Sequence, residues 1–239
     1  MSHAAIPVRT PTILIIGASR GLGYAMAVEF LAKGWHVVGT VRATNGPTLL
    51  HALADSHSQS VEVETVDITR PDEIDALRVR LSNRTFDILF VNAGTTNPDP
   101  TQTIGEVSTV DFVDLMIANA LSPMRVVERL SGLVPADGLI GVMSSGQGSI
   151  ADNESGQREV YRGSKAALNQ FMRSFAARQA KTKRAMLLMA PGWVRTDLGG
   201  PDGRLSIEES VPGVVETLLA KQGRPGLEFL DYRGRTVRW

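Results

Sequence analysis

Residues 12–23 read TILIIGASRGLG, and this stretch decides the fold. Its apolar start, TILII, has the length and composition of a buried strand. Glycines follow in the spacing G-x-x-x-G-x-G, and a helical pattern runs from Gly21 to Lys33. Glycines between a strand and a helix let the backbone turn tightly and approach a pyrophosphate, to which the helix N-terminus offers amide donors. The stretch predicts a nucleotide-binding turn; the alternative is an ordinary glycine turn.

The rest of the chain repeats this alternation of apolar runs and helical patterns. Further strands are predicted at residues 36–41, 61–66, 86–91, 139–144, 185–190 and 227–231. Further helices are predicted at residues 47–54, 71–81, 109–130, 157–181 and 208–221. Strands alternating with helices form parallel βαβ units, and right-handed crossovers favour a doubly wound sheet. The expected fold class is α/β, a single Rossmann-type doubly wound parallel sheet with helices on both faces, forming one domain over residues 1–239.

Composition narrows the classes of function. The chain has 239 residues, and its 25 lysines and arginines balance 25 aspartates and glutamates. A zero net charge gives no sign of a nucleic-acid surface. There is no cysteine, and the four histidines form no grouping typical of ligands, so no metal site is expected. No apolar run is long enough to span a membrane, which makes a cytoplasmic protein without membrane partners the expectation.

In a doubly wound sheet, ligands bind at the carboxyl ends of the strands. The second predicted strand is followed by TVRATNG, and no Asp or Glu occurs from Phe30 to Ala54. An NAD site usually needs a carboxylate there for the ribose 2′-hydroxyl, whereas two arginines, Arg42 and Arg20, suit a 2′-phosphate. The sequence therefore favours NADP(H) over NAD(H); the alternative is a pair of solvated arginines.

Two more strand ends carry candidate residues. Asp67 follows the third strand, where its carboxylate could contact an adenine or accept loop amides. The fourth strand ends in Asn92, Ala93 and Gly94, which are small enough for the backbone to approach a cofactor.

The stretch VYRGSKAALNQF at residues 160–171 places Tyr161 and Lys165 four positions apart on a predicted helix. This spacing puts both side chains on one face. A free tyrosine has a pKa of about 10, and a neighbouring cation favours the phenolate and lowers that pKa. Tyr161 is therefore a candidate general acid/base; the alternative is an amphipathic helix with an exposed Tyr and Lys.

Together these motifs resemble those of the short-chain dehydrogenase/reductase family. The segments PGWVRTDLGG and FLDYRGRTVRW are closest to its carbonyl-reductase-like and C-factor-like branch. The matching features cover almost the whole chain in the family's order: GASRGLG at 17–23, Asp67, VNAG at 91–94, Asn119 in MIANALSP, the serines at 144–145, YRGSK at 161–165 and PGWVRT at 191–196.

The resemblance implies roles for individual residues. Tyr161 would be the general acid/base, Lys165 would lower its pKa and bind the nicotinamide ribose, Ser145 would polarise a carbonyl and Asn119 would hold a proton-relay water. Ser145, Gln147, Trp193 and Leu198 would line the substrate pocket. The implied cofactor-binding residues are Gly17, Ser19, Arg20, Gly21, Leu22, Gly23, Arg42, Asp67, Ile68, Asn92, Ala93, Gly94, Tyr161, Lys165, Pro191, Gly192, Val194 and Thr196.

The activity implied is that of an NADP(H)-dependent oxidoreductase that reduces a small-molecule ketone or aldehyde, or oxidises an alcohol in reverse. Two alternatives stay open. One is a 3-oxoacyl-acyl-carrier-protein-type reductase, which needs a basic docking patch. The other is a non-catalytic nucleotide-sensing or signalling protein on the same fold. The basic docking patch that the first alternative needs could be made by Arg125, Arg129, Arg158, Arg162 and Arg173.

Two further expectations concern the assembly and the pocket. The resemblance implies a homodimer or homotetramer formed through the helices around 109–130 and 157–181; the alternative is a monomer, which the carbonyl-reductase-like branch also includes. Ser145 and Tyr161 are sixteen positions apart, a few more than is common in the family. We expect the polar loop between them to reshape one wall of the pocket, and residues 193–206 to form its lid, with Trp193 and Leu198 making it apolar.

Overall fold

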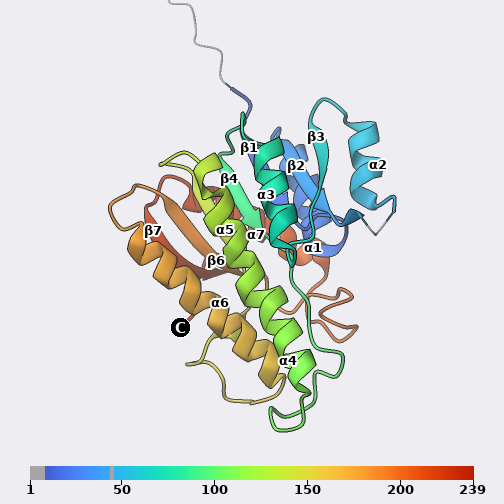
Figure 1. Ribbon diagram of the computed structural model, residues 1–239, viewed down its shortest axis with the longest axis vertical. Helices are drawn as coiled ribbons and strands as arrows, with labels where there is room; N and C mark the ends of the chain where they lie inside the picture. The colour runs from blue at the N-terminus through green and yellow to red at the C-terminus, as the bar shows by residue number, and fades with distance from the viewer. Residues whose placement is uncertain (1–8, 44–45) are drawn as a thin grey trace, which may run out of the picture.

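The computed structural model describes residues 9–43 and 46–239, and it shows one sheet between two layers of helices (Figure 1). Seven parallel strands lie in the order β3-β2-β1-β4-β5-β6-β7. The predicted doubly wound α/β fold is confirmed; the single-domain assignment of residues 1–239 stays a prediction. The strands are β1 (Thr12–Ile16), β2 (His36–Val41), β3 (Val61–Thr65), β4 (Ile88–Val91), β5 (Leu139–Met143), β6 (Ala185–Ala190) and β7 (Gly226–Asp231).

Helices cover both faces of the sheet. In Figure 1, α3, α5 and α6 lie in front of the strands, while α1 and α7 lie behind them. The helices are α1 (Gly21–Ala32), α2 (Leu49–Ser56), α3 (Pro71–Arg80), α4 (Thr109–Met116), α5 (Ser122–Leu130), α6 (Glu159–Arg178) and α7 (Ile207–Lys221), with a π-helical turn at Ile117–Leu121 and short 3₁₀ turns at Ser131–Leu133 and Gly146–Gly148.

Side chains that alternate along each strand divide the core into two halves. Leu14 and Ile16 of β1 pack in the half beneath α3, α5 and α6, whereas Ile13 and Ile15 pack in the half beneath α1 and α7. All four side chains are fully buried. Alternation places neighbours on opposite faces, and burial on both faces explains why the strand sequences are apolar throughout.

The main difference from prediction is the helix expected over residues 109–130. It is two α-helices joined by the π-helical turn Ile117–Leu121. A π-turn adds one residue to a helical turn and is often found at a functional site. Asn119, at the centre of this turn, is fully buried.

The glycine turn after β1 depends on close backbone packing. Gly17 has a φ of +89°, and its N–H donates to Thr40 Oγ1 at 2.9 Å. Its carbonyl accepts a hydrogen bond from Asn92 Nδ2 at 2.7 Å. A Cβ on Gly23 would lie 2.0 Å from the Gly17 carbonyl oxygen. Gly23 therefore has to be a glycine so that α1 can approach the turn.

We expect Gly23→Ala to destabilise the protein by about 1–3 kcal/mol, the usual cost of overpacking a close contact. Gly163, exposed on α6 with no atom near a built Cβ, provides the control. Gly163→Ala should leave the stability unchanged or raise it by up to about 1 kcal/mol. Urea denaturation measures both free energies of unfolding, and equal effects in the two variants would contradict the packing argument.

Candidate active site

A cavity of about 1070 Å³ opens along the carboxyl ends of the strands. It collects loops that are far apart in the sequence, because β1 and β4 are neighbours at the point where the strand order reverses. Every residue predicted for the substrate pocket lines it. So do these predicted cofactor-binding residues: Gly17, Ser19, Arg20, Gly21, Leu22, Arg42, Asp67, Ile68, Asn92, Ala93, Gly94, Tyr161, Lys165, Pro191, Gly192, Val194 and Thr196.

Two predicted site residues lie behind the cavity wall. Gly23 packs against the backbone of the glycine turn, as described above. Asn119 is fully buried, and its neighbour Ala118 lines the cavity instead. Gly23 therefore supports the glycine turn from behind instead of lining the cavity, while the relay-water role of Asn119 stays a prediction.

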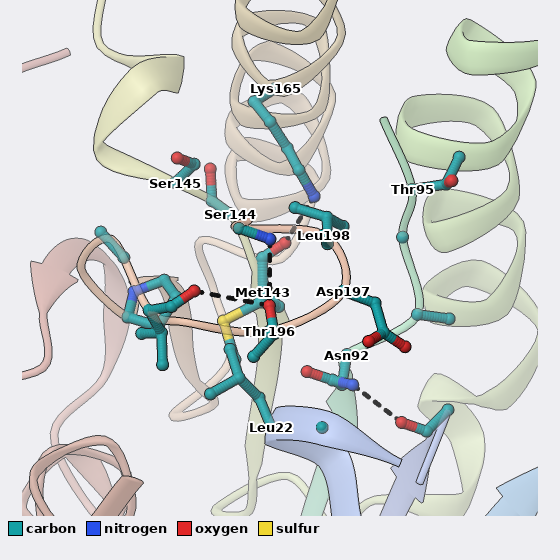
Figure 2. A pocket seen from close by; sticks show the side chains of 18 of the residues that line it. Leu22, Asn92, Thr95, Met143, Ser144, Ser145, Lys165, Thr196, Asp197 and Leu198 are labelled. Carbon is teal, nitrogen blue, oxygen red and sulfur yellow. Dashed lines mark hydrogen bonds between the residues drawn. The ribbon is translucent and has the colours of Figure 1, made fainter. Parts of the chain in front are cut away.

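The side chain of Lys165 reaches from α6 to the end of β5 (Figure 2). Its Nζ donates to the Met143 carbonyl at 3.0 Å, and the residue is 2% exposed. Burial lowers the pKa of Lys165 to about 8. The ammonium lies 5.8 Å from the centre of the Tyr161 ring, so the two side chains share the site, as their spacing predicts.

The lowered pKa expected for Tyr161 is not found in this structure. Burial raises the pKa of Tyr161, while the Ser145 side chain and the Arg158 charge act in the opposite direction. The Lys165 ammonium donates to the Met143 carbonyl, at 3.0 Å. The phenol is therefore protonated at neutral pH and is a proton donor.

Asn119 connects the loop after β4 to α6. Its Oδ1 accepts from Thr95 N at 2.8 Å, and its Nδ2 donates to the Thr95 carbonyl at 2.8 Å and to Ser164 Oγ at 3.0 Å. Ser164 Oγ donates in turn to the Tyr161 carbonyl at 2.8 Å. The chain of bonds runs from the cavity wall to the backbone of Tyr161, so Asn119 and Ser164 position that residue.

A second buried pair holds the serines at the end of β5. Ser144 Oγ donates to Asn169 Oδ1 at 2.6 Å, and Asn169 Nδ2 donates to the Gly148 carbonyl at 3.2 Å. The hydroxyl of Ser145 is left at the cavity, where it accepts from Gln147 N at 3.1 Å.

Sequence reasoning missed Ser164 and Asn169 as supporting residues. Both lie on the apolar face of α6, where Ser164 is fully buried and Asn169 is 3% exposed. Polar side chains on a buried helical face need hydrogen-bond partners, and that was the signal available in the sequence.

The segment after β6 forms one side of the cavity mouth. Trp193 is 43% exposed and its Nε1 donates to the Gly199 carbonyl at 2.7 Å. Leu198 packs against Leu115, Val160 and Tyr161. Leu198 therefore makes the wall beside the phenol apolar, whereas the Trp193 ring is tied into its own loop.

Arginines and Asp67 occupy the other end of the cavity. Arg20 pairs with Asp197 at 3.5 Å with both side chains exposed, which makes the pair weak. Arg42 is exposed at the cavity edge. Asp67 Oδ1 accepts from Thr69 N at 2.9 Å, so one carboxylate oxygen holds the loop while the residue lines the cavity.

The arginines considered for a carrier-protein patch have separate surroundings. Arg129 pairs with Asp75, Arg173 stacks on Trp239, and Arg162 donates to the Gln157 carbonyl. Arg158 lines the cavity.

Comparison with known proteins identifies the family. The short chain dehydrogenase family matches residues 11–204. The chain belongs to this family. It is therefore an oxidoreductase by family, and its Rossmann-like fold is that of the family.

Three relatives show how close the resemblance is. One is a short-chain dehydrogenase/reductase from Burkholderia multivorans with bound NADP, on which the structure superposes with a TM-score of 0.96. The two sequences are 77% identical, and the match covers 97% of this chain and 100% of that one. A carbonyl reductase from Pseudomonas aeruginosa PAO1 in complex with NADP has a TM-score of 0.88 and 35% identity, covering 97% and 100% of the two chains. The C-signal protein of Myxococcus xanthus is 34% identical over 155 residues, 64% of this chain and 92% of that protein.

None of the helices that the structure describes has both the length and the apolar character needed to cross a membrane. Within residues 9–43 and 46–239, no group of three or more His, Cys, Asp or Glu side chains is arranged to hold a metal ion.

The lowered pKa of Lys165 predicts a dependence of stability on pH. Its pKa is about 8 in the native state against 10.5 ordinarily, so the unfolded chain binds more protons between these values. The free energy of unfolding should therefore rise with pH through this window, relative to Lys165→Met. From pH 7 to about pH 9.5 the difference should change by about 2 kcal/mol.

Urea denaturation at the two pH values measures this change. Lys181 is exposed, and Lys181→Met provides the control, for which no such change is expected. A constant difference between the wild type and Lys165→Met at both values would mean that Lys165 keeps an ordinary pKa.

Proposed function

We propose that the protein is an NADPH-dependent reductase of a ketone or aldehyde, which oxidises the alcohol in reverse. The observation that carries the proposal is the convergence of Tyr161, Ser145 and Lys165 at one cavity. Three groups that can donate a hydrogen bond or a proton lie there beside the apolar side chain of Leu198. Such a site suits a carbonyl oxygen on which negative charge develops during reduction.

Each catalytic residue has its own role in the proposed reduction. The Tyr161 phenol, kept protonated by burial, donates the proton to the carbonyl oxygen, and the Ser145 hydroxyl donates a hydrogen bond to that oxygen. Lys165, whose ammonium donates to the Met143 carbonyl beside the phenol, would bind the nicotinamide ribose of the cofactor. Asn119 and Ser164 hold the Tyr161 backbone in place.

The residues that line the cavity fit a dinucleotide with a 2′-phosphate. The amide groups of the glycine turn at the start of α1 suit a pyrophosphate, and Arg20 and Arg42, which line the same cavity, would bind the ribose phosphate. Two NADP-bound relatives support this choice. Bound NADPH supplies the hydride, and Lys165, Pro191, Gly192, Val194 and Thr196 would hold its nicotinamide end.

Tyr161→Phe should lower turnover of carbonyls by about 10²-fold or more, because it removes the proton donor. NADPH should still bind. Tyr24, on α1 and outside the cavity lining, provides the control, and Tyr24→Phe should keep the activity. Absorbance of NADPH follows turnover and its fluorescence follows binding. Full activity of Tyr161→Phe would remove the phenol from the mechanism.

Arg42→Ala should weaken NADPH binding about tenfold to a hundredfold, the loss expected for a charge-assisted hydrogen bond. NADH affinity should change far less, because NADH has no 2′-phosphate. Arg78, exposed on α3, provides the charge control, and Arg78→Ala should bind both cofactors like the wild type. Equal loss of both affinities would contradict the assigned role of Arg42.

Exposed apolar side chains on the helices bear on the assembly of the protein. Phe112 on α4, Leu121 in the π-turn and Phe171 on α6 are 40–46% exposed, which supports a homodimer or homotetramer through these helices. A cytoplasmic location is likewise a proposal. Tight NADPH binding without turnover of free or carrier-linked carbonyls would instead favour a nucleotide-sensing protein.

A further inference from the structure

Arg158 lies at the cavity with part of its guanidinium unsatisfied. The residue lines the cavity, and its guanidinium carbon is 5.5 Å from the centre of the Tyr161 ring. Its Nε is buried and has no hydrogen-bond partner in the described part of the chain. A buried donor without a partner is costly, so such an atom calls for an explanation.

The backbone of Arg158 is unfavourable as well. Its φ is 60° and its ψ is 41°, and among the described residues it is the one non-glycine with a positive φ. It is the N-cap of α6 and makes no side-chain cap bond. A cation at this end of a helix opposes the helix dipole. Arg158 therefore does nothing for the start of the helix, and local strain of this kind clusters at binding sites.

Three carboxylates from the same loop, the helix start and the cavity lining have partners of their own. The Glu159 carboxylate accepts from Ile104 N at 2.8 Å, and Asp152 pairs with Arg238. Asp231, which also lines the cavity, pairs with Arg235 at 2.6 Å. No carboxylate of the described residues pairs with Arg158, so its charge is available to a bound molecule.

Gln147 adds a second polar group at the same wall. Its side chain lines the cavity two positions after Ser145, and its Oε1 is buried without a partner among the described residues. Arg158 and Gln147 thus both line the cavity that holds Ser145 and Tyr161, and each has one buried polar atom without a partner among the described residues.

We propose that Arg158 determines substrate specificity by binding a carboxylate carried by the carbonyl substrate, with the amide nitrogen of Gln147 as a second donor. A guanidinium binds a carboxylate through two parallel hydrogen bonds. Because Arg158 lies next to the Tyr161 ring, the carboxylate has to be within a few bonds of the reacting carbonyl. The substrates are therefore short oxo acids. The inference rests on the proposed carbonyl reduction.

The test compares oxo acids with their uncharged esters. Reduction of pyruvate, acetoacetate and levulinate is measured with NADPH, each beside its methyl ester. The wild type should have the higher kcat/KM on at least one acid. Arg158→Gln should lower that kcat/KM about a hundredfold, the usual effect of removing one partner of a buried charge pair. The kcat/KM on the matching ester should fall much less, by the part that the Arg158 charge contributes through Tyr161. Arg78→Gln should behave like the wild type.

Two results would overturn the proposal while leaving the proposed function in place. One is a wild type that reduces the esters as well as the acids. The other is an equal loss on acid and ester in Arg158→Gln. A preference for dihydroxyacetone phosphate over all three acids would overturn the choice of a carboxylate.

If no carbonyl is reduced at all, the proposed function fails. The carboxylate site at Arg158 is then tested by binding alone. Levulinate is then titrated against the protein by ligand-observed NMR. Binding by the wild type that is lost in Arg158→Gln supports the carboxylate site, and absence of binding by the wild type overturns it.

Arg158→Asn separates this role from a structural one. Asparagine adopts positive φ more readily than arginine and is a favoured N-cap, so the Tm should rise or stay the same while the preference for acids is lost. A lower Tm together with equal losses on acid and ester would mean that Arg158 serves the fold by stacking on Tyr161.

Discussion

The buried ammonium of Lys165 is the interaction on which the site depends. A charge at 2% exposure needs a partner, and the partner is the Met143 carbonyl at the end of β5. This bond ties α6 to the strand whose next residues are Ser144 and Ser145. The phenol of Tyr161, one turn before Lys165, is thereby brought to the Ser145 hydroxyl, so the position of a single charge aligns the two groups.

The buried face of α6 extends this role along the helix. Ser164 joins it to Asn119 of the π-turn, and Asn169 joins it to Ser144 and to the Gly148 carbonyl. In a low-dielectric interior hydrogen bonds are strong, and a polar group without a partner is costly. These bonds therefore permit few arrangements of α6 and the loops that it contacts. The helix therefore both packs against the sheet and fixes the loops after β4 and β5.

The cavity has two electrically distinct ends. At one end Arg20 and Arg42 stand beside the glycine turn, where burial is slight and salt screens the charges. At the other end Tyr161 and Lys165 are buried, and burial shifts both pKa values toward the neutral forms. Anion binding at the first end depends on exposed charge, whereas proton transfer at the second depends on exclusion of water.

The sequence by itself determined the order of strands and helices, the glycine turn and the residues that meet at the carboxyl ends of the strands, because these follow from local periodicity and from how parallel strands connect. The tertiary structure alone decided the π-turn at Asn119, the packing role of Gly23 and the raised pKa of Tyr161. It also decided that Arg158 has a buried, unpaired Nε. Desolvation and unpaired donors depend on neighbours far away in the chain, and helical spacing shows which side chains share a face but not where their charges are directed.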